Sequence, residues 1–144
     1  MGNCLMPHHQ PGWALPNGHV VRSHMEAALC EHLSKAATPH THGAPEDLSF
    51  EVPIGPDRRA TYIPSIVLTH SKKDNRTILI EPLDSPHPGG GARRFSGFRH
   101  EHGQEYFLVV VARRPLHHEI PADAYDLIIP LEDFEPLEKF LREL

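Results

Sequence analysis

The sequence predicts a single α/β domain in which a central mixed β-sheet is flanked by helices. Segments with a strand-like apolar pattern are interleaved with segments of helical period, as in domains that pack helices on a sheet. The chain has 144 residues, which suits one domain with a buried core. Its hydrophobic content of 39% and charged content of 23% are ordinary for a globular protein.

The first 19 residues are predicted to form an irregular arm, and residues 20–144 the folded domain. The arm is rich in Pro, Gly, His and Asn and has no periodicity. The first helix is expected from Ser23 to about Ala37, because Ser23-His24-Met25-Glu26 has the capping-box pattern and an apolar face follows. The next segment, residues 38–47, is predicted to be a loop rich in Pro, His and Gly.

Five segments are predicted to be strands of one sheet. Each is alternating or continuously apolar, and turn residues separate them. They are Leu48–Ile54, Thr61–Thr69, Arg76–Ile80, Glu105–Ala112 and Asp126–Ile129. Two further helices are expected, a short one at Arg93–His102, which Gly97 weakens, and a C-terminal one at Phe134–Leu144.

Composition also bears on the location of the protein. The longest apolar runs have five to seven residues, too few to cross a bilayer, so no membrane role is expected. The N-terminus has no cationic region followed by an apolar segment, so secretion is not indicated. Cys4 and Cys30 are too few for a disulfide framework. The sequence therefore predicts a cytoplasmic protein.

Charge is distributed unevenly along the chain. The net charge of −5 argues mildly against nucleic-acid binding. Between Asp57 and Arg114, however, ten Lys or Arg residues stand against six acids, which gives this segment a charge of +4. The last fourteen residues carry five acids and two bases, a charge of −3. This pattern allows either a local basic face or scattered, solvated charges.

Histidine is unusually frequent, with thirteen in the chain, but its spacing does not predict a compact zinc site. The paired histidines lie mostly near predicted turns or termini, and the two cysteines form no pair with metal-ligand spacing. These pairs are His8-His9, His40-x-His42, His100-x-His102 and His117-His118. The sequence therefore predicts adventitious metal affinity and no structural zinc.

Glu81 is the first candidate for a functional residue. It follows Thr77–Ile80, an apolar run typical of a strand buried on both faces, and precedes Pro82, which cannot donate to a β-ladder. A carboxylate at the end of a buried strand is costly unless it is hydrogen-bonded, paired or holding a cation. Glu81 is therefore a candidate metal or catalytic residue, with a salt bridge to a central arginine as the alternative.

The chain resembles the PD-(D/E)XK nuclease superfamily in three features. These are the order of its elements, an N-terminal helix with Arg22-Ser23-x-x-Glu26, and a hairpin that ends in Glu81. The resemblance covers roughly Val20 to Leu144 and implies a restriction-endonuclease-like fold. In that family, acids from the helix and the hairpin hold Mg²⁺, and a lysine assists the attacking water. The resemblance thus implies a hydrolase that uses Mg²⁺ or Mn²⁺, with DNA and a second copy of the chain as candidate partners.

Residue by residue, the resemblance implies Glu26, Ser65 and Glu81 as catalytic positions and Glu81, Asp84 and Glu26 as metal ligands. Ser65 stands where the family has an aspartate, and Leu83 where it has the lysine. A serine hydroxyl is a poor ligand for Mg²⁺, and leucine cannot position a water. Two functions remain open: an endonuclease with a degraded site, or an inactive module that binds nucleic acid or protein.

The implied site residues also have structural explanations. Glu26 suits the capping box, and Asp84, which precedes Ser-Pro, suits a turn. Three arginines of the predicted short helix are candidate phosphate contacts, or else a solvated helix face. These are Arg93, Arg94 and Arg99.

Overall fold

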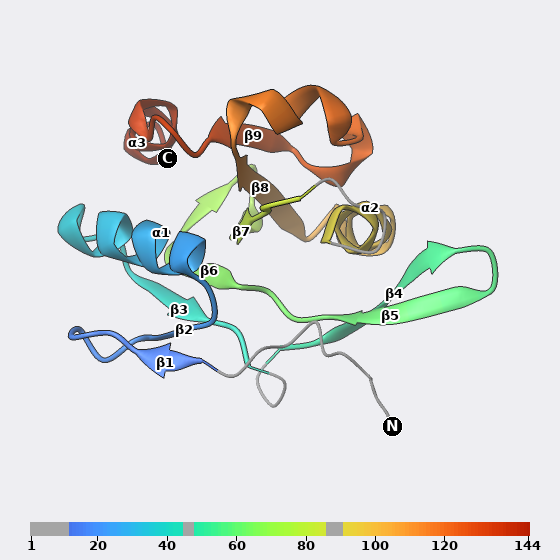
Figure 1. The fold of residues 1–144 in the computed structure, drawn as a ribbon, viewed down its shortest axis with the longest axis horizontal. Coiled ribbons are helices and arrows are strands. Elements are labelled where there is room, and N and C mark those ends of the chain that lie inside the picture. The colour runs from blue at the N-terminus through green and yellow to red at the C-terminus, as the bar shows by residue number, and fades with distance from the viewer. Residues whose placement is uncertain (1–11, 45–47, 86–90) are drawn as a thin grey trace.

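A five-stranded mixed sheet is the centre of the fold (Figure 1). The structure is a computed structural model that describes residues 12–44, 48–85 and 91–144, so Cys4 and His8-His9 lie outside the described residues. The strands lie in the order β3-β6-β7-β8-β9. They are β3 (His40–His42), β6 (Ile66–Lys73), β7 (Arg76–Pro82), β8 (Tyr106–Ala112) and β9 (Leu127–Pro130). The predicted α/β class with a central mixed sheet is confirmed.

Both parallel and antiparallel pairs occur in this sheet. β3, β6 and β7 pair antiparallel, whereas β7, β8 and β9 pair parallel. β7 and β8 lie at the centre and are buried on both faces, which explains their uninterrupted apolar sequences. Alternate side chains fill two separate cores: Leu79 and Leu108 contribute to one, and Ile78 and Val109 to the other.

Two helices cover one face of the sheet. They are α1 (His24–Lys35) and α3 (Glu135–Arg142), and they contribute Leu29, Leu33 and Leu137 to the core on this face. The Ser23 hydroxyl caps α1 by accepting a hydrogen bond from the backbone N–H of Glu26 at 3.0 Å. The predicted N-terminal and C-terminal helices are therefore confirmed, each slightly shorter than expected.

The opposite face is covered by a helix, a hairpin and two 3₁₀ turns. These are α2 (Gly91–His102), the hairpin of β4 (Phe50–Gly55) and β5 (Arg58–Tyr62), η1 (Arg114–Glu119) and η2 (Ala122–Ala124). Gly97 allows α2 to lie against the hairpin, because a Cβ there would be 1.9 Å from the carbonyl oxygen of Pro53. This glycine, predicted to weaken the helix, is a packing requirement.

The membership of the sheet differs from the prediction. Leu48–Ile54 contains β4, but β4 pairs only with β5 and forms a separate two-stranded sheet. The predicted strand Thr61–Thr69 is divided, since β5 ends at Tyr62 and β6 begins at Ile66, and Pro64 lies in the interruption. The fifth strand of the central sheet is β3, in the segment predicted to be a loop. β3 was missed because three residues flanked by Pro39 and Gly43 carry too short a pattern.

Part of the predicted arm is ordered in the structure. β1 (Trp13–Ala14) pairs antiparallel with β2 (Val20–Val21). The turn between them carries Asn17 and His19 next to α1, where Asn17 contacts Cys30 and Ser34. No helix in the described part of the chain is long and apolar enough to cross a membrane.

Candidate metal centre and adjoining cleft

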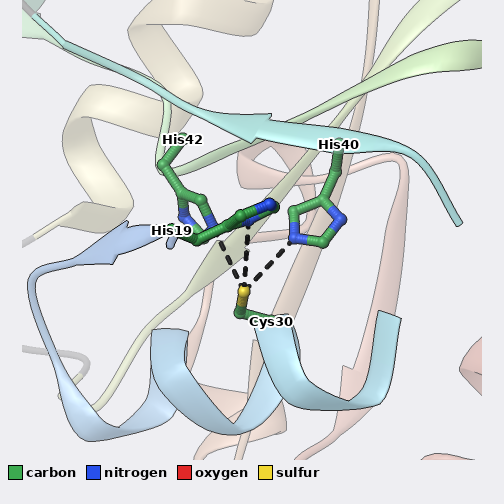
Figure 2. Close-up of side chains that lie close together, drawn as sticks. All are labelled: His19, Cys30, His40 and His42. Carbon is green, nitrogen blue, oxygen red and sulfur yellow. Dashed lines mark hydrogen bonds between the residues drawn. The ribbon is translucent and has the colours of Figure 1, made fainter. Parts of the chain in front are cut away.

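Three histidines and a cysteine converge between β3 and α1 (Figure 2). They are His19, Cys30, His40 and His42. One potential ligand atom from each residue lies within 4.8 Å of all the others. Cys30 and His40 are buried, and His19 and His42 are only partly exposed. Residues up to 23 positions apart in the sequence thus form one cluster.

The local fold explains this convergence. His40 and His42 are alternate residues of β3, and they pair with Leu68 and Ile66 of β6, whose side chains face α1. Cys30 lies on the buried stripe of α1, next to Leu29. Gly43, which follows β3, packs directly against the chain before β6, because a Cβ there would lie 1.8 Å from the carbonyl oxygen of Pro64.

Four of the six distances between the ligand atoms match the edges of a tetrahedron around a metal ion, and the other two, which involve His40, are within 4.8 Å. The Cys30 Sγ lies 3.4 Å from His19 Nδ1, 3.4 Å from His40 Nε2 and 3.3 Å from His42 Nε2. His42 Nε2 lies 3.2 Å from His19 Nδ1. Zinc bonds of about 2.3 Å to sulfur and about 2.0 Å to nitrogen give tetrahedral edges of about 3.5 Å for S–N and about 3.3 Å for N–N. The cluster is therefore of the right size for such an ion.

Hydrogen bonds outside the cluster orient two of the imidazoles. The Nδ1–H of His42 donates to Glu26 Oε2 at 2.6 Å, and the Nδ1–H of His40 donates to the carbonyl oxygen of Thr38 at 2.9 Å. Because Nδ1 carries the proton in each ring, Nε2 presents its lone pair to the centre. A carboxylate or carbonyl behind each ligating histidine is the usual support of a metal site.

The protonation states also suit a cation. Burial, with a contribution from His42, lowers the pKa of His19, and burial lowers the pKa of His40 as well. Both imidazoles are therefore held in the neutral form that binds metals. The Asn17 side-chain amide lies 3.5 Å from the Cys30 sulfur, where it can donate to a thiolate. The four ligand atoms face one another, and few protons lie between them to form hydrogen bonds. One cation would bind the lone pairs of all four atoms.

Glu81 lies elsewhere, at the end of β7 on the face covered by α2. Its carboxyl group is buried, with 3% of the residue exposed. It accepts hydrogen bonds from the Tyr62 hydroxyl, from the Ser65 backbone N–H at 2.8 Å and from the Ser65 hydroxyl at 2.7 Å. Burial raises the pKa of Glu81 to about 7 although these donors favour the charged form. No described residue forms an ion pair with Glu81, so the salt-bridge alternative is wrong.

The structure brings together only part of the site implied by the resemblance. Ser65, Glu81 and Asp84 line one cleft, but Asp84 is exposed and has no polar partner among the described residues. Glu26 is not among the lining residues of this cleft. Its two oxygens accept from the Arg22 backbone N–H at 3.3 Å and from His42. Glu26 thus hydrogen-bonds to the backbone at the N-terminus of α1 and supports the histidine cluster.

The three arginines of α2 face different surroundings. The Nε–H of Arg94 donates to the Thr61 carbonyl oxygen at 3.0 Å, and Arg94 lines the Glu81 cleft. Arg93 is exposed and lines a different pocket. Arg99 forms an ion pair with Asp126 at 2.8 Å. The three side chains do not share one surface in the structure. Their contact with nucleic acid stays a prediction.

Sequence reasoning missed the four residues of the cluster. The available signal was His40-x-His42, whose spacing of two places both side chains on one face of a strand. The other two members come from a turn and a helix, so their contribution depends on tertiary structure. The expectation that the histidines form no compact group is wrong for His19, His40 and His42, and His40-x-His42 lies in a strand instead of a loop.

Comparisons with protein families, with curated proteins and with solved structures found no match to the chain.

Proposed function

We propose that this protein binds one zinc ion through His19, Cys30, His40 and His42, and that the ion is structural. The observation that carries the proposal is the convergence of four ligand atoms within 4.8 Å of one another, in which three imidazole nitrogens lie 3.3–3.4 Å from Cys30 Sγ. The carboxylate of Glu26 and the carbonyl of Thr38, each behind one imidazole, support it further.

The ligand set favours zinc over the hard cations that the family resemblance implied. Thiolate and imidazole ligands suit Zn²⁺, which binds both in tetrahedral sites. Mg²⁺ and Mn²⁺ prefer oxygen ligands, and the four atoms of this cluster are three nitrogens and a sulfur. Use of Mg²⁺ or Mn²⁺ stays a separate prediction that concerns Glu81.

A structural role follows from the number and origin of the ligands. Catalytic zinc sites have three protein ligands and keep a position for water, whereas four protein ligands close the coordination sphere. The ligands here come from the turn before β2, from α1 and from β3. An ion bound to all of them would tie the N-terminal hairpin and helix to the edge of the sheet.

The metal content of the purified chain tests this proposal. The protein is prepared without an affinity tag, dialysed extensively against metal-free buffer and analysed by elemental mass spectrometry. We expect one zinc per chain, and replacement by Co²⁺ is expected to give the visible absorption of a tetrahedral site with a sulfur ligand. Cys30→Ser and His40→Ala should each lose the metal.

His118→Ala provides the matched control, because His118 is exposed on η1 and lies outside the cluster. It should retain one zinc. Zinc below one tenth of an equivalent in the wild-type chain after loading, or equal retention by Cys30→Ser and His118→Ala, would refute the proposal.

A further inference from the structure

A cleft beside Glu81 is lined by arginines that have no carboxylate partner among the described residues. The cleft has a volume of about 840 Å³. Arg22 lines it at the junction of β2 and α1, Arg94 on α2, and Arg113 in the segment after β8. Among the described residues, none of these three guanidinium groups forms an ion pair.

Arg94 is the most informative of the three. It is partly buried, and burial lowers its pKa, because no carboxylate in the described part of the chain compensates the loss of water. A partly desolvated cation is normally paired. Its Nε–H is fixed by the Thr61 carbonyl oxygen at 3.0 Å, which orients the guanidinium and leaves its terminal N–H groups for another acceptor.

We propose that this cleft binds the phosphate group of a small ligand, with Arg22, Arg94 and Arg113 as its contacts. Guanidinium groups bind phosphate oxygens through paired, charge-assisted hydrogen bonds. Ser23, His24 and Met25 also line the cleft, so the first turn of α1 directs the positive end of its dipole toward it. This site is separate from the metal centre and does not rest on the proposed zinc binding.

The acidic residues of the cleft do not oppose this assignment strongly. Glu81 is buried, bonded to Tyr62 and Ser65, and has a pKa raised to about 7, so at neutral pH it carries only part of a negative charge. Asp84 is the other carboxylate among the described lining residues, and it is exposed to solvent, which screens its charge.

The size and surroundings of the cleft favour a small ligand over a nucleic acid. Pockets for small molecules have volumes of about 300–1,000 Å³, a range that includes this cleft. A nucleic-acid track needs basic side chains that continue beyond one pocket. Arg93 lies on a different pocket and Arg99 is paired with Asp126, so α2 does not continue the basic surface.

Calorimetric titration of the full chain as purified with inorganic phosphate and with phenyl phosphate, at constant ionic strength, tests the proposal. We expect saturable binding of both. Arg94→Ala should weaken it about tenfold or more, the effect of losing charge-assisted hydrogen bonds. Arg142→Ala should bind like the wild type, because Arg142 is exposed on α3 and outside the cleft. If Arg94→Ala does not fold, as judged by circular dichroism, the exposed Arg113→Ala decides instead, with the same expected loss.

A short single-stranded oligonucleotide without terminal phosphates forms the second arm of the experiment. We expect it not to compete with phenyl phosphate. Absence of phosphate binding in the wild-type chain would overturn the proposal, as would equal weakening by Arg94→Ala and Arg142→Ala. Tight binding of the oligonucleotide that displaces phenyl phosphate would assign the cleft to nucleic acid and overturn the small-ligand assignment.

Discussion

Glu26 shows how one residue can support two structural roles. Its carboxylate accepts a hydrogen bond from the Arg22 backbone at the start of α1 and another from His42 in the candidate metal centre. The capping-box interpretation was therefore correct for the Ser23 side chain, but the return bond goes to the backbone of Arg22. The second role follows only from the position of β3.

The contact between Glu26 and His42 can be tested by Glu26→Gln. This change removes the negative charge behind the imidazole and keeps the size of the side chain. We expect zinc affinity to fall by about 10–100-fold, the usual effect of losing such a supporting group. The measurement is competition with a chromophoric chelator. Glu31→Gln, at an exposed position on the same helix, is the control and should bind zinc normally. Equal affinities of the two variants would contradict the assigned role.

Glu81 makes stability depend on pH in a predictable direction. The folded-state pKa is about 7, above the ordinary value of 4.5, because burial disfavours the carboxylate. Its contribution to stability is complete below pH 4.5 and is lost as the pH rises toward 7. The difference between 7 and 4.5 corresponds to about 3 kcal/mol. Urea unfolding should therefore show Glu81→Gln gaining stability relative to the wild type between pH 5 and pH 8. Parallel pH curves for the two proteins would contradict this.

Hydrolysis of phosphodiesters stays a prediction of the family resemblance, and we expect it to be weak. The Glu81 carboxylate already accepts three hydrogen bonds, which a metal ion would have to displace in part. Leu83 also supplies no group to assist a water. We expect no robust nicking of supercoiled DNA in Mg²⁺, and at most weak nicking in Mn²⁺. Turnover in Mg²⁺ that Glu81→Ala abolishes would show that Asp84 or another residue has rebuilt the site.

The sequence could identify Glu81 as unusual, because a carboxylate interrupted a continuous apolar strand. It could not identify the donors that make its burial tolerable. Ser65 lies next to Glu81 because it directly precedes β6, which pairs antiparallel with β7. Tyr62 reaches Glu81 from the end of a different strand, β5. The local sequence pattern predicts that burying the Glu81 charge is costly. The hydrogen bonds that offset this cost depend on tertiary structure.

At the scale of elements, β3 and the β1–β2 hairpin are the parts with the least stability of their own. β3 has three residues, pairs only with β6 and forms the edge of the sheet. β1 and β2 have two residues each. Such short pairings bury little apolar surface and give little stability of their own. Their positions therefore depend on contacts with α1, where the candidate metal centre lies.

Removal of the metal should loosen these elements selectively. In hydrogen–deuterium exchange of the metal-loaded chain, a strong chelator is expected to accelerate exchange in residues 13–21 and in β3. β7 and β8, at the centre of the sheet, should keep their protection. His118→Ala, treated in parallel, should behave like the wild type. Unchanged exchange in β3 after complete removal of zinc would show that the metal does not hold the edge strand.

The elements that were predicted well are those with long apolar patterns. β7, β8 and the two helices α1 and α3 were located to within a few residues, because burial sets each pattern, in one core for the helices and in both cores for β7 and β8. The pairing partner of β4 was not predicted. Alternation indicates that a strand has one buried face, but it does not indicate the pairing partner. The buried face of β4 packs on α2, and in the described structure β4 pairs with β5 alone.

At the scale of the whole molecule, the start of α1 joins two separate chemical environments. Arg22, Ser23 and His24 line the cleft on one side, while Cys30 belongs to the histidine cluster on the other and Glu26 supports it through His42. The cluster lies toward the core that α1 and α3 cover, and the cleft lies over the end of β7 beside α2. One helix thus fixes the position of both sites relative to the sheet.

The stability of the whole domain should therefore depend on zinc. An ion that binds only the folded chain stabilises it by about 4 kcal/mol when its free concentration is about 1,000 times the dissociation constant. For a chain of this length, this corresponds to an increase in Tm on the order of 10 °C. Differential scanning calorimetry with and without zinc measures the increase. His118→Ala should show the same increase as the wild type, whereas Cys30→Ser should show almost none, because it lacks the sulfur that contacts all three imidazoles. An equal increase in Cys30→Ser would mean that zinc stabilises the protein through histidines outside the cluster.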